Sequence, residues 1–191
     1  MKTKFRIEAL EQFEEMHNPA IKCQPVPSSI IDEYAEKLPD LLQDVWLKYG
    51  WCGFAKGFFW FVNPNDYLSI PKDWLKAEFN DAYVFARTAF GDLFFLKEGT
   101  VYILIVQWGE VHELSSDLSR FMGSIMCYKD YLKNGLLAPL FKKALTKLGT
   151  LEADECYAIV PALALGGEQK IEYLQKTNLQ AYLALLSQLH Q

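Results

Sequence analysis

The sequence predicts an α+β fold in which a mainly antiparallel β-sheet is flanked by N-terminal and C-terminal helices. Apolar side chains recur at helical spacing near both ends of the 191-residue chain. Between these ends, short runs rich in aromatic and β-branched residues are separated by turns that contain glycine. The connections between these runs are too short for a parallel sheet, because crossover connections need about a dozen residues or more.

Three helices are expected before the sheet. Residues 4–17 place apolar side chains at helical spacing among acidic positions, and an Asn-Pro pair ends this run. Residues 28–38 form a second helical pattern, which stops at the next proline. A third pattern over residues 39–49 ends at Gly50, because glycine readily adopts the positive φ that closes many helices.

The strands of the expected sheet follow these helices. Residues 51–62 combine glycines with aromatic side chains of high strand propensity, which predicts a turn and then one strand. Residues 67–80 predict short helix and loop. Four further strands should form a meander, because turn residues separate them at hairpin spacing. Their approximate ranges are 83–89, 93–97, 101–107 and 110–114.

Helices are expected again after residue 115. Residues 118–125 and 128–148 each carry an apolar stripe, and residues 180–189 form a last helix. The segment 128–148 holds five lysines and one aspartate, which is most simply a solvent-exposed helix face. No low-complexity linker separates the strands from the tail, so we expect one shared core. We assign to it Trp46, Phe90, Leu93 and Leu165.

Charge and cysteine content restrict the class of protein. Nineteen Lys and Arg against 24 Asp and Glu give a formal charge of −5, which argues against direct nucleic-acid binding and favours a basic partner. The four cysteines form no CxxC pair, so we expect neither a zinc site nor a disulfide scaffold. No apolar run approaches the roughly 20 residues that span a bilayer, and no signal core follows the first residues. We therefore expect a cytoplasmic protein with no membrane contact.

The sequence contains no recognisable catalytic or cofactor motif. The HExxH, GxSxG, P-loop and GxGxxG patterns are all missing, so we expect no enzyme, no metal and no cofactor. Asp92 could form an acid/base pair with Asp66 or Glu110, but a carboxylate after glycine is ordinary hairpin chemistry. Arg87 should point inward from a strand, either into a structural ion pair or into a ligand site. An alternative function is therefore a small-molecule or regulatory module, with an aromatic cleft at Trp60, Arg87 and Asp92.

Aromatic side chains crowd between Trp46 and Phe61. Most of them should belong to the core, but alternate residues of a strand face opposite sides of a sheet. One set is therefore free to form a contact surface, and aromatic anchors surrounded by acidic residues suit a protein interface. We expect exposed members of the group Phe54, Phe58 and Trp60 to be such anchors.

Two long segments resemble known families. The run Leu38-Pro39-Asp40, the motif Gly57-Phe58-Phe59-Trp60 and the stretch from Ala86 to Leu93, in this order and spacing, resemble the GAD-like domain. The tail, with Val160-Pro161-Ala162-Leu163-Ala164-Leu165-Gly166-Gly167, resembles the C-terminal domain of type VI secretion immunity proteins. The resemblance places these domains at residues 1–126 and 127–191, packed as one unit.

The resemblance implies a bacterial immunity protein that binds and neutralises a co-encoded toxin. In the best-known relatives this toxin is a DNase delivered by a type VI secretion apparatus, so the implied partner is a basic nuclease domain. An acidic inhibitor would associate quickly with a basic active cleft. We expect acidic contact residues on the first helix, on the third helix and in the loop after residue 62, namely Glu8, Glu11, Glu15, Asp40, Asp44 and Asp66.

Overall fold

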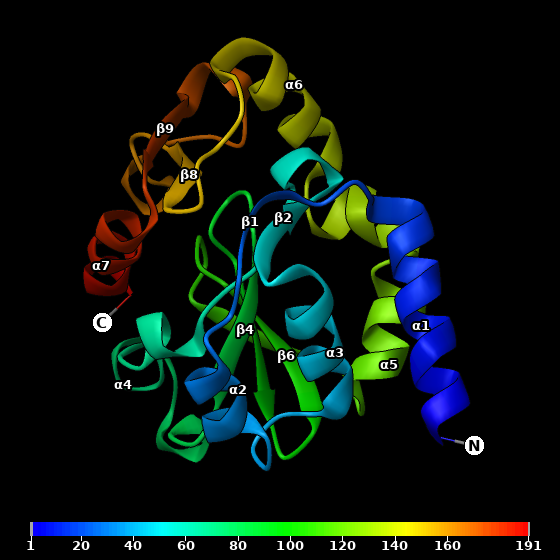
Figure 1. Ribbon diagram of the computed structural model, residues 1–191. Helices are drawn as coiled ribbons and strands as arrows, with labels where there is room; N and C mark the ends of the chain where they lie inside the picture. The colour runs from blue at the N-terminus through cyan, green and yellow to red at the C-terminus, as the bar shows by residue number, and fades with distance from the viewer. Residues whose placement is uncertain (1, 191) are drawn as a thin grey trace.

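A seven-stranded antiparallel sheet forms the centre of the structure, a computed structural model that describes residues 2–190 (Figure 1). The strand order follows the chain order, so each strand pairs with the next and the sheet is a meander. This confirms the predicted α+β fold with a mainly antiparallel sheet. The strands are β1 (Ile21–Gln24), β2 (Trp51–Phe54), β3 (Phe59–Phe61), β4 (Tyr83–Thr88), β5 (Leu93–Lys97), β6 (Thr100–Ile105) and β7 (Glu110–Ser115).

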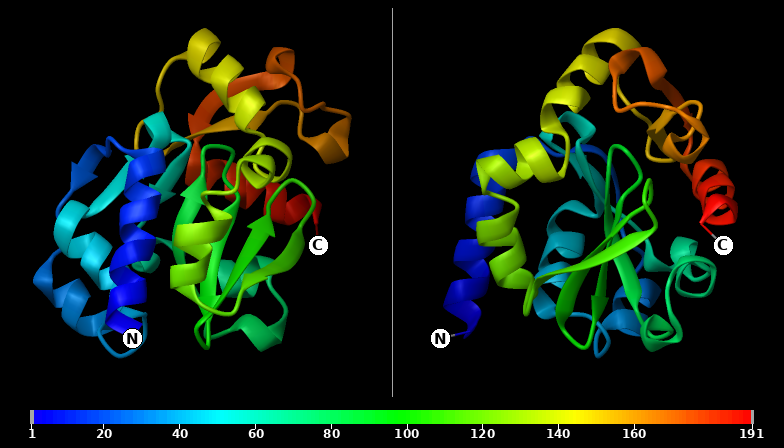
Figure 2. Two further views of the ribbon diagram at one scale, coloured as in Figure 1. Left: turned by 90° about the vertical axis from the view of Figure 1, so that its right-hand side faces the viewer. Right: turned by 180° about the vertical axis from the view of Figure 1, so that it is seen from behind.

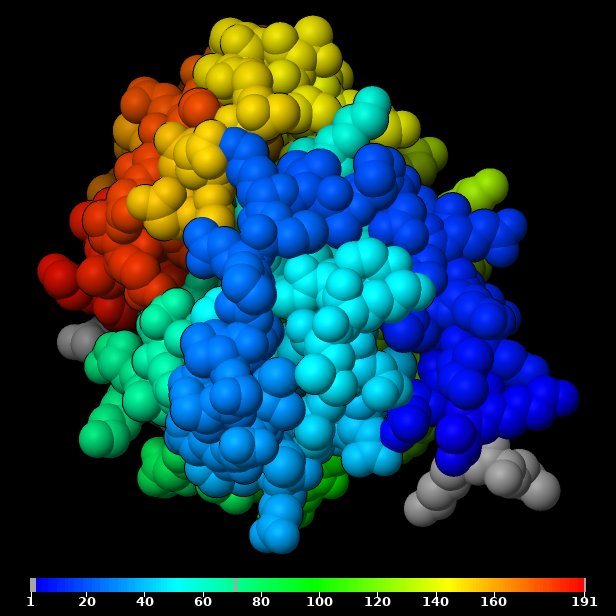
Figure 3. Space-filling view, viewed as in Figure 1, coloured from blue at the N-terminus to red at the C-terminus, as the bar shows by residue number. Residues whose placement is uncertain are grey.

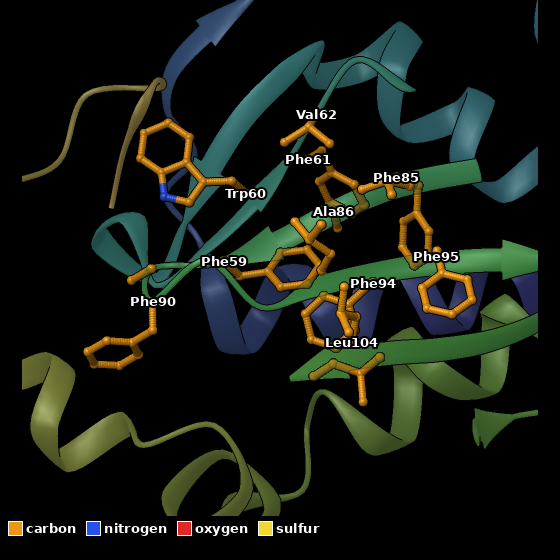
Figure 4. Close-up of a cluster of buried hydrophobic side chains, with 14 of the residues drawn as sticks. Phe59, Trp60, Phe61, Val62, Phe85, Ala86, Phe90, Phe94, Phe95 and Leu104 are labelled. Atoms are coloured by element: carbon orange, nitrogen blue, oxygen red, sulfur yellow. The ribbon is translucent and has the colours of Figure 1, made fainter. Parts of the chain in front are cut away.

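One face of the sheet is covered by α1 (Lys2–His17), with α5 (Leu118–Arg120) and the wide helical turn Phe121–Ile125 beside it. The ring of Phe13 in α1 lies 5.1 Å from that of Phe54 and 5.7 Å from that of Phe59, centroid to centroid. Phe94 of β5 contacts Phe121 from the same side, at 5.1 Å. Figure 4 draws Phe59, Phe61 and Phe94 of this layer, together with side chains outside it such as Trp60 and Phe90.

Two further helices, α2 (Ser28–Tyr34) and α3 (Asp40–Tyr49), lie between β1 and β2 in the chain. The buried sides of α2 and α3 contact each other through Tyr34 and Trp46, whose ring centroids are 6.0 Å apart. Short helical turns and α4 (Ile70–Trp74) fill the connection from β3 to β4. All three predicted N-terminal helices are therefore present, although α2 ends earlier than expected.

The C-terminal residues build a unit on the other side of the sheet from α1, as the rear view in Figure 2 shows. A helical turn at Tyr131–Gly135 leads into α6 (Ala138–Leu148), then β8 (Glu155–Ile159), β9 (Leu174–Asn178) and α7 (Leu179–Leu189). Strands β8 and β9 form an antiparallel pair of their own. In the space-filling view, the β1 segment runs over the surface from α1 toward this unit (Figure 3). Lys22 of β1 forms an ion pair there with Glu152.

The region 51–62 differs from the sequence prediction. It forms a hairpin of β2 and β3 rather than a turn and one strand. Ala55 and Lys56, in the tight turn between the strands, have φ values of 50° and 62°. These residues are not the Gly, Asn or Asp that normally signal such a turn, so the sequence pattern hides it.

The expected long helix over residues 128–148 is broken in two. Leu137 has a φ of 59° and separates the turn at Tyr131–Gly135 from α6. A proline occupies the first turn of α6, where its missing N–H costs nothing, so it marks a new helix start.

A single hydrophobic cluster joins the sheet to the C-terminal unit, as expected. Trp46, Phe90 and Leu93 are buried in it. The assignment of Leu165 to the core is wrong, because its side chain is 60% exposed. Leu165 lies on a single helical turn, Leu163–Leu165, in the β8–β9 connection, and Gly166 ends that turn with a φ of 92°.

Candidate functional site

The acidic side chains of α1 and α3 share one surface of the molecule. The Arg6 guanidinium of α1 bridges the two helices, with Nη1 2.5 Å from Asp40 Oδ2 and Nε 2.9 Å from Asp44 Oδ2. Asp40 is nevertheless 77% exposed. A second ion pair, Lys48 to Glu14 at 2.6 Å, fastens the other end of the same helix pair. The predicted aspartates are thus brought beside α1, and part of their charge is used to hold the helices together.

The predicted glutamates of α1 are exposed along this surface. Glu8 pairs only loosely with Lys4, at 3.7 Å, and Glu11 and Glu15 extend the acidic face. Glu11 lines a groove between α1 and α3 together with Ile7 and Leu47, which are 50% and 69% exposed. Sequence reasoning missed these two aliphatic residues. In the sequence they stand out only as apolar residues that lie outside the buried stripe of their helices.

Asp66 lies elsewhere. It is exposed on the short helical turn Pro64–Tyr67, where its backbone oxygen accepts a hydrogen bond of 3.2 Å from Gln180 Nε2 of α7. Partial burial raises the pKa of its carboxyl group. The sequence prediction names the loop around Asp66 as a contact surface beside those of α1 and α3, and the structure places this loop next to α7.

The three predicted aromatic anchors are buried. Phe54, Phe58 and Trp60 are 0%, 4% and 2% exposed, so none of them is available to a partner on the free protein. Phe54 packs under α1, and Phe58 lies 5.0 Å from the ring of Phe141 in α6. The prediction fails because both faces of the sheet are covered. The strand alternation therefore separates two buried sets rather than a buried and an exposed set.

Arg87 and Trp60 connect the sheet to the C-terminal half of the chain. The Arg87 guanidinium lies 4.9 Å from the centre of the Trp60 ring. Its Nη2 donates a 2.7 Å hydrogen bond to the backbone oxygen of Ala153, and its Nη1 donates a 3.1 Å bond to that of Thr88. Among the described residues no carboxylate lies within ion-pair distance of Arg87, and burial lowers the pKa of the guanidinium.

These contacts show that the predicted ligand cleft at Trp60 and Arg87 is not open. The space expected to be an aromatic cleft at Trp60 and Arg87 is filled by the backbone after α6, since both side chains are buried and Arg87 touches that backbone directly. The expected carboxylate partner of Arg87 is replaced by two carbonyl oxygens and an aromatic face, which also stabilise a guanidinium.

Asp92 holds the end of the β4–β5 hairpin in place. Its Oδ2 accepts a 3.2 Å hydrogen bond from Thr88 Oγ1, and its Oδ1 accepts a 3.2 Å bond from the backbone N–H of Val106 after β6. Burial raises the pKa of Asp92 to about 6, although these two hydrogen bonds act in the opposite direction. The carboxylate therefore joins three strands, as hairpin chemistry predicts, and retains capacity to accept further hydrogen bonds.

Within residues 2–190, no three histidine, cysteine, aspartate or glutamate side chains gather closely enough to hold a metal ion. None of the helices described is both long and apolar enough to cross a bilayer. The four cysteines are free thiols, of which Cys52 and Cys156 are buried.

Comparison with known proteins identifies the two parts of the chain. Residues 7–108 match the GAD-like domain, and residues 115–190 match the family described as the C-terminal domain of the T6SS immunity protein Tdi1. No protein of curated function matches the chain. The second match supports an immunity role.

A solved structure shares the fold. It is described as the crystal structure of Atu4351 from Agrobacterium tumefaciens, and it has a TM-score of 0.80 at 19% sequence identity. The likeness covers 93% of this chain and 88% of that one, so the meander and the C-terminal unit occur there in a similar arrangement. The segment that matches the GAD-like domain spans more than half of the 191 residues. The chain therefore belongs to the GAD-like family, and it carries after that domain the C-terminal domain of type VI secretion immunity proteins.

Proposed function

We propose that this protein is a cytoplasmic immunity protein that binds and neutralises a cognate toxin of a bacterial type VI secretion system. The observation that carries the proposal is the match of residues 115–190, from the end of β7 through α7, to an immunity-protein family. Neutralisation needs only a complementary surface, so the missing catalytic motifs agree with this function.

The toxin is proposed to be a nuclease with a basic active cleft. A nuclease must attract phosphate, and an acidic inhibitor with a formal charge of −5 is attracted to the same cleft. The protein would act stoichiometrically, with acidic side chains guiding the encounter and buried contacts holding the complex.

The groove between α1 and α3 is the first surface to test. It combines the exposed aliphatic side chains of Ile7 and Leu47 with three acids. Asp44 and Glu14 are paired with Arg6 and Lys48 in the same groove, which leaves Glu11 as the acid without an ion pair among the described residues. Apolar contact area with an acidic rim is the composition that a basic protein partner requires. Asp66 stays a separate candidate, because it lies near α7.

Co-expression with the toxin encoded beside this gene tests the proposal. The protein should restore growth, form a complex with the toxin, and inhibit DNA cleavage completely at one equivalent. Leu47→Arg replaces an exposed apolar contact with a positive charge and should weaken binding to a basic partner at least tenfold. Leu165→Arg is the matched control, since Leu165 is 60% exposed on the distant β8–β9 connection. A toxin that kills equally well with the protein present, and does not bind it, contradicts the proposed function.

A further inference from the structure

A cleft of about 380 Å³ lies where the two halves of the chain meet. The β6–β7 hairpin supplies one wall and residues 131–137 supply the opposite one, with Ile159 of β8 closing an end. The C-terminal unit arches over the hairpin ends in the rear view of Figure 2. Phe90, also in the lining, points away from the aromatic cluster under α1 (Figure 4). This cleft is separate from the groove between α1 and α3.

The cleft contains two carboxylates, Asp92 and Glu110, and neither pairs with a lysine or arginine of the described residues. Asp92 lies in its wall and is 6% exposed. From residues 2–190 its carboxylate accepts two hydrogen bonds, although it has sites for about four. Glu110 lies at the opening, 3.2 Å from His112. Among the described residues, no lysine or arginine lines the cleft.

A second polar group in the wall lacks a partner. Gln107 is 5% exposed, and its Nε2 donates a 2.8 Å hydrogen bond to Tyr182 Oη while its buried Oε1 has no partner among the described residues. Tyr182 Oη also accepts a bond from the Ile159 N–H. Turning the amide over would exchange the unpaired oxygen for an unpaired NH₂ group. A buried polar atom without a partner destabilises the free protein, and a ligand that donates to it relieves that cost.

The remaining walls suit an aliphatic stem. Ile103, Ile105 and Leu137 line the cleft, and the Trp108 ring is 55% exposed at its edge. Tyr131 also lines the cleft, and burial, with a smaller contribution from the nearby Asp92 carboxylate, raises the pKa of its phenol. An aromatic rim, apolar walls and acceptors without donors together fit a cation carried on a hydrocarbon chain.

We propose that this cleft receives a basic side chain of the toxin, a lysine or an arginine, whose cationic end reaches Asp92 and Gln107 while its stem packs on Trp108. The proposal rests on the immunity function proposed above. It adds a second contact to the groove between α1 and α3. The segment from α5 to Gly135 joins the two, because its first part packs on α1 and its last part lines the cleft.

Isothermal titration of a catalytically inactive toxin domain into the purified full chain tests the proposal. Asp92→Asn removes the charge at nearly constant shape, and Trp108→Ala removes the rim. Each should weaken binding at least tenfold. Glu172→Gln and Leu68→Ala are the matched controls, because these exposed residues lie outside the cleft, and both should bind within twofold of the wild type.

A scan of the toxin's surface lysines and arginines to alanine identifies the inserted side chain. One toxin variant should lose affinity for the wild-type protein and show no further loss with Asp92→Asn, because both changes remove the same contact. If Asp92→Asn does not fold, the same cycle is run with Trp108→Ala, whose side chain is exposed in the free protein.

The outcomes separate the two proposals. If the wild type does not bind the toxin, the immunity function fails. If the wild type binds, but Asp92→Asn and Trp108→Ala bind within twofold of it, the immunity function stands and the cleft proposal is overturned. Agmatine, a free guanidinium compound, is titrated as a further arm. Competition between agmatine and the toxin supports the proposal, whereas agmatine binding at Asp92 without any effect on toxin affinity assigns the cleft to a small ligand and overturns it.

Discussion

At the scale of single residues, two buried ionisable groups make opposite contributions to the pH dependence of stability. His17 is 2% exposed, and its Nε2 contacts the backbone oxygen of Met126 at 2.8 Å. Burial lowers the pKa of His17, so its contribution to stability is lost as the pH falls below its ordinary value of 6.5. Burial raises the pKa of Asp92, so its carboxyl group holds a proton more tightly in the folded state than in the unfolded state, and ionisation at higher pH lowers stability.

We expect Asp92→Asn to gain stability relative to the wild type as the pH rises. The shift of Asp92 from 3.8 to about 6 makes ionisation cost the wild-type fold about 3 kcal/mol, at 1.36 kcal/mol per pKa unit. That cost is absent below about pH 4 and complete above about pH 6. Urea unfolding of the wild type and the variant at about pH 4 and pH 7 measures this cost. His17 is present in both proteins, so its contribution cancels in the difference between them. An equal difference at the two pH values would contradict the assignment.

The role of Arg87 is a feature that the sequence does not predict. A buried strand arginine predicts either a structural pair or a ligand site, and sequence periodicity placed Arg87 inside correctly. The choice between these roles depends on Ala153, which is 66 positions away in the chain and supplies the oxygen that Arg87 binds. No local pattern carries that information. Gln107 and Trp108 attract no attention in the sequence for the same reason.

At the scale of elements, strong local patterns predict well and weak ones fail. Strands β4 to β7 match the predicted ranges closely, because alternating side chains and hairpin turns mark both their length and their ends. Strand β1 was missed, since three of its four residues are exposed and it lies at the sheet edge. Strands β8 and β9 were missed because a long connection separates them, so neither predicts the other.

The junction of α3 with β1 offers a sharp test of element packing. Gly50 and Gly149 both end helices with extended ψ, at φ values of 77° and 79°. A Cβ on Gly50 would lie 2.0 Å from the backbone oxygen of Gln24, whereas a Cβ on Gly149 meets nothing within 4 Å. We expect Gly149→Ala to cost about 1–2 kcal/mol from positive φ alone.

Gly50→Ala should cost at least about 2 kcal/mol more than Gly149→Ala, because β1 must also move away from α3. Chemical denaturation of both variants measures the difference. Loss of protection from hydrogen exchange at β1 alone would place the damage at this junction. Equal costs for the two variants would show that β1 does not pack on the end of α3.

At the scale of the whole molecule, the sequence predicts which segments are helical and which are strands better than it predicts what covers them. The aromatic residues Phe58 and Trp60 were expected partly at the surface, yet α6 and the chain after it cover that side of the sheet. Helix α6 belongs to the segment that matches the immunity family. A division of the chain at residues 126 and 127 stays a prediction, and the hydrophobic core runs continuously across it.

Charge acts on the scale of the whole molecule, so the association rate is the quantity that reports it. If the toxin is basic, as proposed above, the formal charge of −5 should make the rate constant for association fall as salt rises, while the dissociation rate changes little. The Debye length shrinks from about 10 Å at 0.1 M salt to about 3 Å at 1 M. Glu11→Gln combined with Glu15→Gln should reduce the salt dependence, because both carboxylates are exposed on α1.

Stopped-flow mixing with the inactive toxin over this salt range measures both rates. A control variant removes positive instead of negative charge. It combines Lys142→Gln with Lys143→Gln on the exposed face of α6, and it should steepen the salt dependence of the association rate. An association rate that is independent of salt for all three proteins would mean that charge does not guide the encounter. Leu47→Arg and Trp108→Ala would then have to act on the dissociation rate.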